Sequence, residues 1–399
     1  MNNKRKNILF LIEGYPGWGH VLDQARALSF NNNVCIVTPV CLTLSLRRFK
    51  DNLKQFQCLP KCGDKNNDVP AYFPIYIDFS FLPWKYRKHY FQIWTMLFSL
   101  IFLILTKKIK FDIIHAHFIY RPGYIAAILG KIFRRPVVIT AHGSDVHQNL
   151  FLGSSGDIFR KRTLAALRWS DRIIAVSEYL KIVITAQGIG KKTYVVPCGF
   201  ARKLIPALGE GETRLKLSLP MDKKILLFVG NLEPVKGAAI LIGAFEMVYK
   251  QNPNIELVLV GDGSQKKFLE QQVDACGVAE AVCFLGKKSN QEALLYINAA
   301  DIVIVPSRDE GRSVVIFEAL ACGKPVVASK VGGIPETIIN EKLGILVEKE
   351  NPAALAEGIN RALIQSWDKK YLLEHALKYT SNRMASEVSR VYDEVLGLG

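Results

Sequence analysis

The chain has 399 residues, of which 49% are hydrophobic and 22% are charged, and it contains 29 Gly and 17 Pro. These proportions are those of an ordinary globular protein, and they exclude a disordered chain, a collagen and a coiled coil. At about 100 to 200 residues per domain the length predicts two domains. A cleft between two domains is the default position for a site.

Charge is divided unevenly between the two halves of the chain. The net charge is +16, and residues 1–200 account for all of this excess with 28 basic and 11 acidic side chains. Residues 201–399 hold 24 basic and 25 acidic side chains. The asymmetry predicts an anionic partner for the first half, which is a nucleic acid, an anionic bilayer surface or an acidic substrate.

The eight cysteines are scattered, and several lie in apolar runs, so we expect buried free thiols. Cys58 and Cys62 are close together, but no second Cys or His pair follows them at the spacing of a zinc site. We therefore expect no metal there. The first residues contain no apolar signal-peptide region, which predicts a protein that stays in the cytoplasm.

Short β-type apolar runs alternate with helical patterns, which predicts parallel sheets flanked by helices. The first series of expected strands covers residues 8–12, 34–38, 113–116, 137–141, 173–176 and 194–196. The second series covers residues 225–229, 256–260, 282–285, 302–305, 325–328 and 344–347. Both series open with a strand that ends in a glycine-containing turn, so we predict two Rossmann-like domains. Residues 197–220 are rich in Pro and Gly and are typical of a linker, which places the boundary near residue 200.

Residues 90–106 interrupt this alternation with 17 uncharged residues that are mostly apolar on every helical face, and basic residues precede and follow them. Three alternatives are open. The segment is a core helix, a helix or loop that dips into the bilayer interface, or a membrane span, although a span needs about 20 such residues. The aromatic and basic residues Trp84, Tyr86 and His89 favour the interfacial alternative over simple burial.

The loop after the first strand contains Gly17 and Gly19, and backbone can approach a phosphate closely at glycine because it lacks a Cβ. The loop does not match Gly-x-Gly-x-x-Gly, so a dinucleotide site is only weakly supported. We expect His115, His117 and His142 to line the C-terminal edge of the first sheet, where parallel sheets bind ligands. For His115 and His117 we expect structural roles.

Residues 306–323 are the most informative stretch. Ser313 is the expected N-cap of a helix over residues 314–322, and the free N–H groups at its start favour a bound diphosphate. Glu310 precedes the helix, and Glu318 lies inside it with its side chain inclined toward the same end. Two carboxylates thus flank one phosphate pocket, an arrangement that suits recognition of a vicinal diol. The alternatives are two solvated glutamates or the acid/base pair of a glycosidase.

Glu310 and Glu318 are separated by seven residues, and with their flanking sequence they resemble the Glu-x7-Glu motif of glycosyltransferase family 4, whose members are retaining enzymes with the GT-B fold. Further stretches resemble the family, in family order, at residues 112–117, 140–145, 175–177, 196–199, 229–237, 261–263 and 331–336. The resemblance implies two Rossmann-like domains whose parallel sheets face a central cleft. It implies acceptor binding by residues 1–200, nucleotide-sugar binding by residues 201–375, and a helix in residues 376–399 that crosses back to the first domain.

The resemblance also assigns roles to the residues that match the motifs. Lys236 would contact the donor diphosphate and stabilise the charge of the leaving group. Glu310 would bind the hydroxyls of the donor sugar, and Glu318 would bind the nucleotide ribose. His142 would lie near the donor sugar, on the acceptor side.

Backbone donors to the phosphate and sugar are implied at Gly311, Ser313 and Val314, and a position facing the donor phosphates is implied for Gly17 and Gly19. One residue departs from the pattern, because Asn231 stands where the family usually has an arginine. Arg312 is a candidate to replace that cation, and the alternative is a surface arginine.

The implied function is that of a retaining hexosyltransferase, which moves a sugar from a nucleotide-diphosphate sugar to a lipid-linked or polysaccharide acceptor in surface glycan synthesis. Neither half contains an Asp-x-Asp pair, so we expect no metal and no other cofactor. Front-face attack by the acceptor hydroxyl would need no enzyme nucleophile. The basic first domain and residues 90–106 are expected to dock on the anionic inner face of the cytoplasmic membrane.

Two alternatives of other kinds are open. One is a nonhydrolysing sugar-nucleotide epimerase of the same fold, which would need neither an acceptor nor a lipid-binding surface. The other is a nucleic-acid-binding protein, which would explain the charge. The basic residues show no recognition helix and no aromatic stacking ladder, so we do not expect nucleic acid as a partner.

Overall fold

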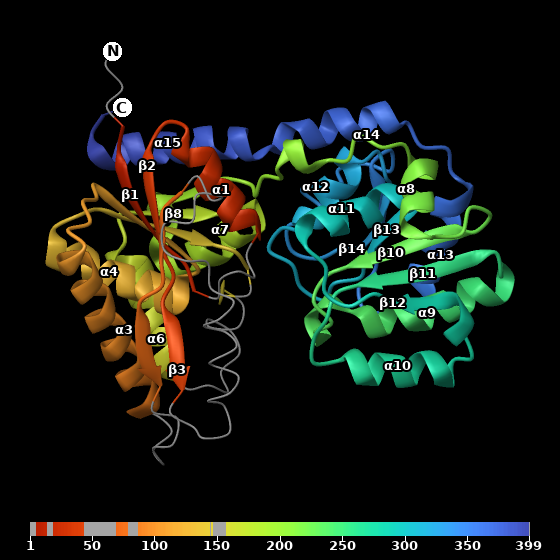
Figure 1. Cartoon of the computed structure of the whole chain (residues 1–399), viewed down its shortest axis with the longest axis horizontal. Helices are drawn as coiled ribbons and strands as arrows, with labels where there is room; N and C mark the ends of the chain where they lie inside the picture. Colours follow the sequence, from red (N-terminus) through yellow and green to blue (C-terminus); the bar gives the residue numbers. More distant parts are fainter. Residues whose placement is uncertain are drawn as a thin grey trace. The chain divides into compact units, whose positions relative to one another are not determined.

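A computed structural model describes residues 5–13, 19–43, 69–78, 87–143, 145–146 and 157–398. The chain divides into two compact units, each built around one parallel sheet (Figure 1). Unit 1 consists of Met1–Val176, Leu180–Val196 and Met384–Gly399. Unit 2 consists of Ser177–Tyr179 and Pro197–Arg383. The expectation of two α/β domains with parallel sheets is confirmed.

The main sheet of unit 1 has the strand order β4-β2-β1-β6-β7-β8-β9. These strands are β1 (Asn7–Leu11), β2 (Asn33–Val37), β4 (Ala71–Tyr72), β6 (Ile113–His117), β7 (Val137–Ala141), β8 (Arg172–Ala175) and β9 (Thr193–Val195). A separate parallel pair joins β3 (Val40–Thr43) and β5 (Ile75–Asp78). The helices of unit 1 are α1 (Gly19–Ser29), α3 (Arg87–Thr106), α4 (Tyr124–Phe133) and α6 (Asp157–Trp169), and α7 (Glu178–Ile184) and α15 (Ser381–Leu396) belong to it from Leu180 and Met384 onward.

The central strands of unit 1 are covered on both faces. Every residue of β6 and β7 is buried, and strands buried on both faces have continuous apolar runs rather than alternating ones. The last helix of the chain contributes to this core, because Val388 and Tyr392 of α15 lie in one apolar cluster with Ile8 and Phe10 of β1.

Unit 2 has the strand order β12-β11-β10-β13-β14-β15, in which neighbours are also parallel. The strands are β10 (Lys224–Val229), β11 (Ile255–Val260), β12 (Val282–Phe284), β13 (Ile302–Val305), β14 (Val326–Ser329) and β15 (Gly344–Val347). The helices are α8 (Glu210–Leu217), α9 (Ala238–Gln251), α10 (Lys266–Ala275), α11 (Asn290–Ala299), α12 (Val314–Ala321), α13 (Pro352–Ile364) and α14 (Lys369–Ala376).

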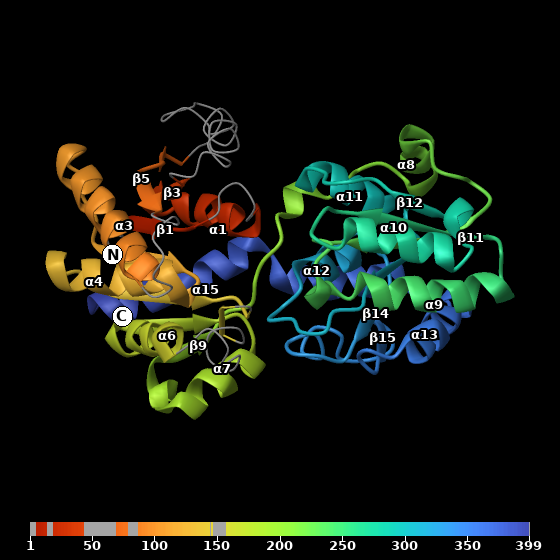
Figure 2. The same cartoon turned by 90° about the horizontal axis from the view of Figure 1, so that it is seen from below.

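Helices cover both faces of the unit 2 sheet (Figure 2). One apolar cluster joins the sheet to α9, α10 and α13, and a second joins its other face to α11, α12 and α14. Along the chain, β11 is added beside β10 and β12 beside β11. The next strand, β13, is added on the other side of β10. The strand order therefore reverses between β10 and β13, and ligands bind at such a point in open parallel sheets.

Each expected strand is present with bounds that differ by at most one residue. The pattern did not predict β3, β4 and β5, which are only two to four residues long. Pro70 immediately precedes β4 and Pro74 immediately precedes β5, and proline inside an apolar run argues against a strand. Residues 90–106 belong to α3, and among the described residues no helix is both long and apolar enough to cross a bilayer.

Candidate functional site

A lysine and a glutamate meet where the strand order of unit 2 reverses. Lys236 follows β10, and Glu310 follows β13, so the two neighbouring strands deliver both side chains to the C-terminal edge of the sheet. The Lys236 Nζ lies 2.6 Å from the Glu310 Oε2. The two side chains are 32% and 12% exposed, which leaves the ammonium group partly open to a ligand. A partly exposed ammonium group can bind an anionic group of a ligand, and the carboxylate beside it can accept hydrogen bonds from hydroxyls of the same ligand.

Two glycines bring the loops of this site together. Gly237 has a φ of +72°, and a Cβ there would lie 2.0 Å from the carbonyl oxygen of Pro306. Gly332 has a φ of +52°, and a Cβ there would lie 1.9 Å from the carbonyl oxygen of Glu310. Any other residue would have to adopt a left-handed conformation and also push the neighbouring backbone away. The loops that carry Lys236 and Glu310 are therefore held in place by backbone packing.

The contact at Gly237 predicts a specific loss of ligand binding. We expect Gly237→Ala to lower the free energy of unfolding by more than the about 1 to 2 kcal/mol that a left-handed alanine costs. We also expect it to weaken, at least tenfold, binding of the nucleotide-sugar donor that the family resemblance implies, because the loops after β10 and β13 must move apart. Gly277→Ala is the matched control, since Gly277 has a φ of +67° but no atom within 4 Å of an added Cβ. Urea unfolding and titration calorimetry measure both effects, and equal binding by the two variants would contradict this prediction.

The helix α12 begins beside Glu310. Gly311 and Ser313 are buried, and Val314 is the first residue of the helix. Ser313 occupies the predicted N-cap position, but its side chain makes no capping hydrogen bond. The first N–H groups of a helix have no partner within the helix, so this end favours an anion. Glu318 is half-buried one turn into the same helix.

Asn231 and Arg312 differ in their positions. Asn231 is exposed in the loop after β10. Arg312 is buried, with 4% of its side chain exposed, so it is not a surface arginine. Its Nη1 lies 3.1 Å from the Glu336 Oε2, and its guanidinium carbon lies 5.5 Å and 5.1 Å from the ring centroids of Phe317 and Tyr379. The structure therefore does not bring Arg312 into the Lys236–Glu310 pair.

The partner of Arg312 was not predicted as a site residue. Glu336 accepts hydrogen bonds from the backbone N–H groups of Glu178 and Tyr179 at 2.9 Å and 2.8 Å, at the start of α7. It thus connects the loop before α12 to the segment Ser177–Tyr179. The sequence offered one signal, because Glu336 closes the stretch 331–336 that resembles the family, but nothing there indicated its partners.

The histidines of unit 1 lie at the C-terminal ends of β6 and β7. The His115 Nδ1 lies 2.6 Å from the Tyr392 hydroxyl, and its Nε2 lies 2.7 Å from the Thr140 Oγ1. Burial lowers the pKa of His115 to about 3, so this ring stays neutral, and both of its nitrogens have partners within unit 1. The His117 Nδ1 lies 2.9 Å from the Nε2 of His142.

The turn that carries His142 is held by a buried carboxylate. Asp145 accepts hydrogen bonds from the backbone N–H groups of His142, Gly143 and Ile119 at 3.1, 2.9 and 2.8 Å. Burial raises the pKa of Asp145, and the three N–H groups oppose that shift. The backbone turn that carries the half-buried side chain of His142 is therefore fixed at the end of β7.

The remaining predicted residues lie partly beyond the described ranges. Gly17, Cys58 and Cys62 are outside the described residues, and Gly19 is the first residue of α1. Within the described ranges, no three or more His, Cys, Asp or Glu side chains gather so as to hold a metal ion.

Two family models match most of the chain. The model described as "Glycosyltransferase Family 4" matches residues 58–202, and the model described as "Glycosyl transferases group 1" matches residues 210–383. The chain is 32% identical over 290 residues to an uncharacterized glycosyltransferase of Methanocaldococcus jannaschii, covering 71% of this chain and 76% of the relative.

Two relatives with named activities also align. A D-inositol 3-phosphate glycosyltransferase of Corynebacterium jeikeium is 28% identical over 311 residues, covering 72% of this chain and 73% of the relative. A putative teichuronic acid biosynthesis glycosyltransferase, TuaC of Bacillus subtilis, is 32% identical over 256 residues, covering 63% of this chain and 61% of the relative.

Solved structures share the fold. HepE of Anabaena, solved in complex with UDP, aligns with a TM-score of 0.73 and 22% identity, covering 97% of this chain and 100% of HepE. Sucrose-phosphate synthase of Thermosynechococcus elongatus aligns with a TM-score of 0.78 and 22% identity, covering 99% and 100% of the two chains. These matches confirm the predicted GT-B fold class.

Proposed function

Because the chain belongs to glycosyltransferase family 4, we propose that it transfers a hexose, with retention of configuration, from a nucleotide-diphosphate sugar to a lipid-linked or glycan acceptor in surface glycan synthesis. The observation that carries this proposal is the contact of 2.6 Å between Lys236 and Glu310 at the reversal of strand order in unit 2. It places a cation and a hydroxyl acceptor beside the start of α12, as a sugar linked to a diphosphate requires.

Each side chain of this site has a proposed role in binding the donor. Lys236 binds the diphosphate and stabilises the negative charge that develops on the leaving group. Glu310 accepts hydrogen bonds from the sugar hydroxyls, and Glu318 accepts them from the ribose. The backbone N–H groups of Gly311, Ser313 and Val314 bind the phosphate together with the helix dipole.

The other predicted donor residues, Asn231, Gly17 and Gly19, contribute from outside α12 in this proposal. Asn231 lies in the exposed loop after β10, where it offers an amide rather than a cation to the diphosphate. Gly19, the first residue of α1, is assigned to the donor phosphates in this proposal, and Gly17, which lies outside the described residues, keeps that assignment from the family resemblance alone. Lys236 and the N–H groups of α12 provide the charge stabilisation that a metal ion would otherwise supply, so we propose catalysis without a metal or another cofactor.

The proposed transfer takes place on one face of the sugar. The bond between the anomeric carbon and the diphosphate oxygen breaks, and a bond from the acceptor hydroxyl oxygen to that carbon forms on the same side. The acceptor proton passes to the leaving phosphate oxygen, so no enzyme nucleophile is needed. By the family resemblance, we assign His142 the role of orienting the sugar from the acceptor side. The anomeric configuration of the product, read by NMR, tests retention directly.

Our proposals for the donor base and for the acceptor class rest on the relatives. HepE was solved with UDP and with UDP-glucose, which supports a UDP-sugar as donor. TuaC is named for teichuronic acid biosynthesis, which supports a surface polymer as acceptor. We propose that transfer takes place at the cytoplasmic face of the membrane, where the basic half of the chain meets anionic lipid.

A binding screen tests the donor site. UDP-, GDP-, ADP- and TDP-sugars are titrated by calorimetry into the wild type, Glu318→Ala and the control Glu357→Ala, which changes an exposed residue of α13. We expect one nucleotide to bind, with at least tenfold weaker binding to Glu318→Ala and unchanged binding to Glu357→Ala, because only Glu318 contacts the ribose. Equal binding by both variants would remove the ribose assignment, and no binding by the wild type would remove the proposed site.

A further inference from the structure

Helix α3 has two apolar faces, and one of them is exposed. The buried face consists of Gln92, Ile93, Met96, Leu97, Leu100 and Ile104. The opposite face carries large apolar side chains that are 45% to 72% exposed, and these are Phe91, Trp94, Phe98, Phe102 and Leu105. At 100° per residue the five fall within an arc of about 80°. We name these five residues the ridge.

The buried face of α3 already has its partners within unit 1. The helix packs against β5 and α4 and lies at the periphery of the unit (Figures 1 and 2). The Thr95 hydroxyl lies 2.9 Å from the carbonyl oxygen of Ile77 in β5, and 3.0 and 3.2 Å from the carbonyl oxygens of Phe91 and Gln92 in its own helix. The ridge therefore points outward because of internal packing, and a contiguous exposed apolar surface of this kind is typical of an interaction site.

Cations gather where the ridge ends. Residues 79–111 contain six Lys or Arg and no Asp or Glu. The loops 107–112 and 134–136 precede the neighbouring strands β6 and β7, and the rings of Phe111 and Phe133 lie 5.5 Å apart between them. Both loops therefore lie at the N-terminal edge of the sheet. Together with the end of α4 they carry the basic cluster, which consists of Lys107, Lys108, Lys110, Lys131, Arg134 and Arg135.

No acidic side chain among the described residues pairs with the cations of the basic cluster. All six side chains are exposed, and within the described part of the chain none of them forms an ion pair. Exposed cations beside an apolar helix face complement an anionic interface, where phosphate groups lie directly above the acyl chains.

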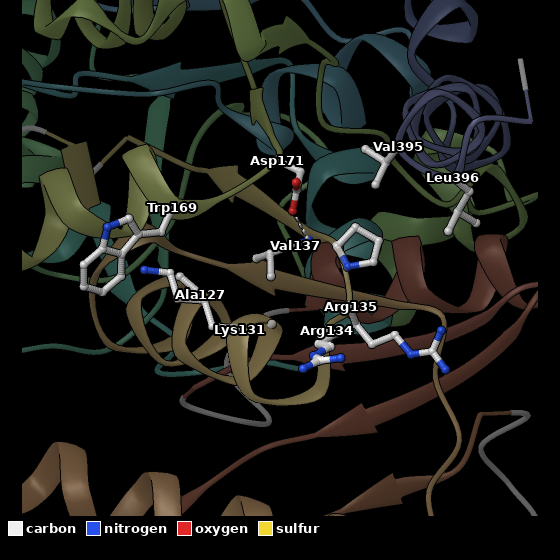
Figure 3. Close-up of a pocket in the computed structure, with 11 residues that line it drawn as sticks. Ala127, Lys131, Arg134, Arg135, Val137, Trp169, Asp171, Val395 and Leu396 are labelled. Carbon is white, nitrogen blue, oxygen red and sulfur yellow. Dashed lines mark hydrogen bonds between the residues drawn. The ribbon is translucent and has the colours of Figure 1, made fainter.

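A pocket of about 500 Å³ opens within the basic cluster (Figure 3). Lys131, Arg134 and Arg135 line it together with Trp169, and the Lys131 Nζ lies 3.6 Å from the centroid of the Trp169 ring. Its one carboxylate, Asp171, accepts a hydrogen bond of 2.8 Å from the backbone N–H of Val137. The pocket thus presents three cations and an aromatic ring, a combination that suits the phosphate of a lipid headgroup.

We propose that the ridge and the basic cluster form one docking surface for an anionic lipid bilayer. The ridge enters the boundary between headgroups and acyl chains, about 5 to 10 Å deep, and the basic cluster binds lipid phosphates. Aromatic side chains with neighbouring Lys and Arg are the residues that membrane interfaces favour. The inference rests on the proposed function for its purpose, which is to hold the enzyme where a lipid-linked acceptor lies.

Other occupants fit this surface less well. A second copy of the chain packed ridge against ridge would cover the apolar side chains, but it would bring only further cations to the basic cluster, because residues 79–111 contain no Asp or Glu. A nucleic acid would satisfy the cations, but its phosphate backbone offers no apolar surface to Phe102 and Leu105. A bilayer satisfies both parts at once.

The experiment measures binding of the full-length protein to vesicles by flotation. One set of vesicles contains 30% phosphatidylglycerol in phosphatidylcholine, and the other contains phosphatidylcholine alone. The ridge variant combines Trp94→Gln, Phe98→Gln and Phe102→Gln. The cluster variant combines Lys107→Gln, Lys110→Gln and Arg135→Gln. We expect the wild type to bind the anionic vesicles and each variant to bind them at least tenfold more weakly, since one cation contributes about fivefold.

Matched controls come from unit 2. Phe268→Gln with Ile364→Gln changes apolar side chains that are 54% and 86% exposed. A second control combines Lys216→Gln, Lys267→Gln and Lys349→Gln, all at exposed positions. Both controls are expected to bind vesicles like the wild type. Acyl chains brominated near the headgroup should quench the tryptophan fluorescence of the wild type more than that of the ridge variant, because the ridge variant lacks Trp94 while both proteins keep Trp169 in the pocket.

Three results would overturn the proposal. They are vesicle binding by the ridge variant equal to that of the wild type, equal binding of the wild type to both vesicle types, and a wild-type dimer that the ridge variant converts to a monomer. The last result would make a second copy the occupant. Nucleotide-sugar binding by the ridge variant is measured in parallel and is expected within twofold of the wild type. If the wild type binds the donor but does not bind vesicles, the docking surface alone is rejected. If the wild type does not bind the donor, the proposed function is rejected.

Discussion

Replacing Lys236 by alanine is expected to lower turnover by about two to four orders of magnitude, because a fixed cation at the leaving group acts mainly in the transition state. The side chain is held by Glu310 at 2.6 Å and is one-third exposed, so its removal leaves the fold intact and opens no core cavity. Steady-state transfer assays should show the loss in kcat, with a smaller change in KM, because the charge on the leaving diphosphate is greatest during bond cleavage.

Lys223→Ala provides the matched control for this measurement. Lys223 lies at the opposite end of β10, is 36% exposed, and is 4.0 Å from the carboxylate of Glu256. Both variants remove a half-exposed lysine that adjoins a carboxylate, and only one of them lies at the C-terminal edge of the sheet. Near-normal turnover by Lys236→Ala would remove Lys236 from the mechanism. Equal losses in both variants would show that the effect comes from stability rather than from catalysis.

The parallel sheets were predictable because their strands are buried on both faces. A strand such as β7, with all five residues buried, has to be apolar throughout, and its sequence contrasts with the polar loops beside it. β5 is different, because Tyr76 is buried while Ile75 is 49% exposed. A short strand of mixed burial, preceded by Pro74, produces no pattern that a sequence can reveal.

The position of Lys236 and Glu310 was also predictable, but their contact was not. Each follows an apolar strand, so the topology of a parallel sheet places both at one edge. The two residues are 74 positions apart, and nothing local indicates that their side chains meet. That contact depends on Gly237 and Gly332, which allow one backbone to approach another. A glycine is visible in a sequence, whereas the segment it approaches is not.

The orientation of α3 could not be predicted from the sequence, for a different reason. The helix is apolar around its circumference, so its periodicity gives no preferred face. The packing of α3 against β5 and α4 decides which side is buried, and β5 was not predicted. Leu100 is fully buried while Phe98, two residues before it, is 72% exposed. Only the packing of neighbouring elements separates two such similar residues.

Arg312→Met is expected to lower the free energy of unfolding by about 2 to 4 kcal/mol. The guanidinium group is buried against Phe317 and Tyr379 and paired with Glu336, and removing one partner of a buried pair leaves the other charge uncompensated. Glu336 stays 25% exposed and keeps its two backbone donors, which places the expected loss at the lower end of the range for buried pairs. Urea unfolding measures this loss.

A loop neighbour of Arg312 supplies the control. Arg308 pairs with Glu350 at 3.2 Å, but the two side chains are 44% and 51% exposed, so Arg308→Met should change stability by less than about 0.5 kcal/mol. If Arg312 positions the loop before α12, Arg312→Met loses stability and weakens donor binding together, and Arg312→Lys restores part of both. If Arg312 instead supplies the cation that Asn231 lacks, Arg312→Met weakens donor binding at least tenfold and matches Arg308→Met in stability. The two measurements thus decide between a residue that holds the donor loop and a residue that contacts the donor.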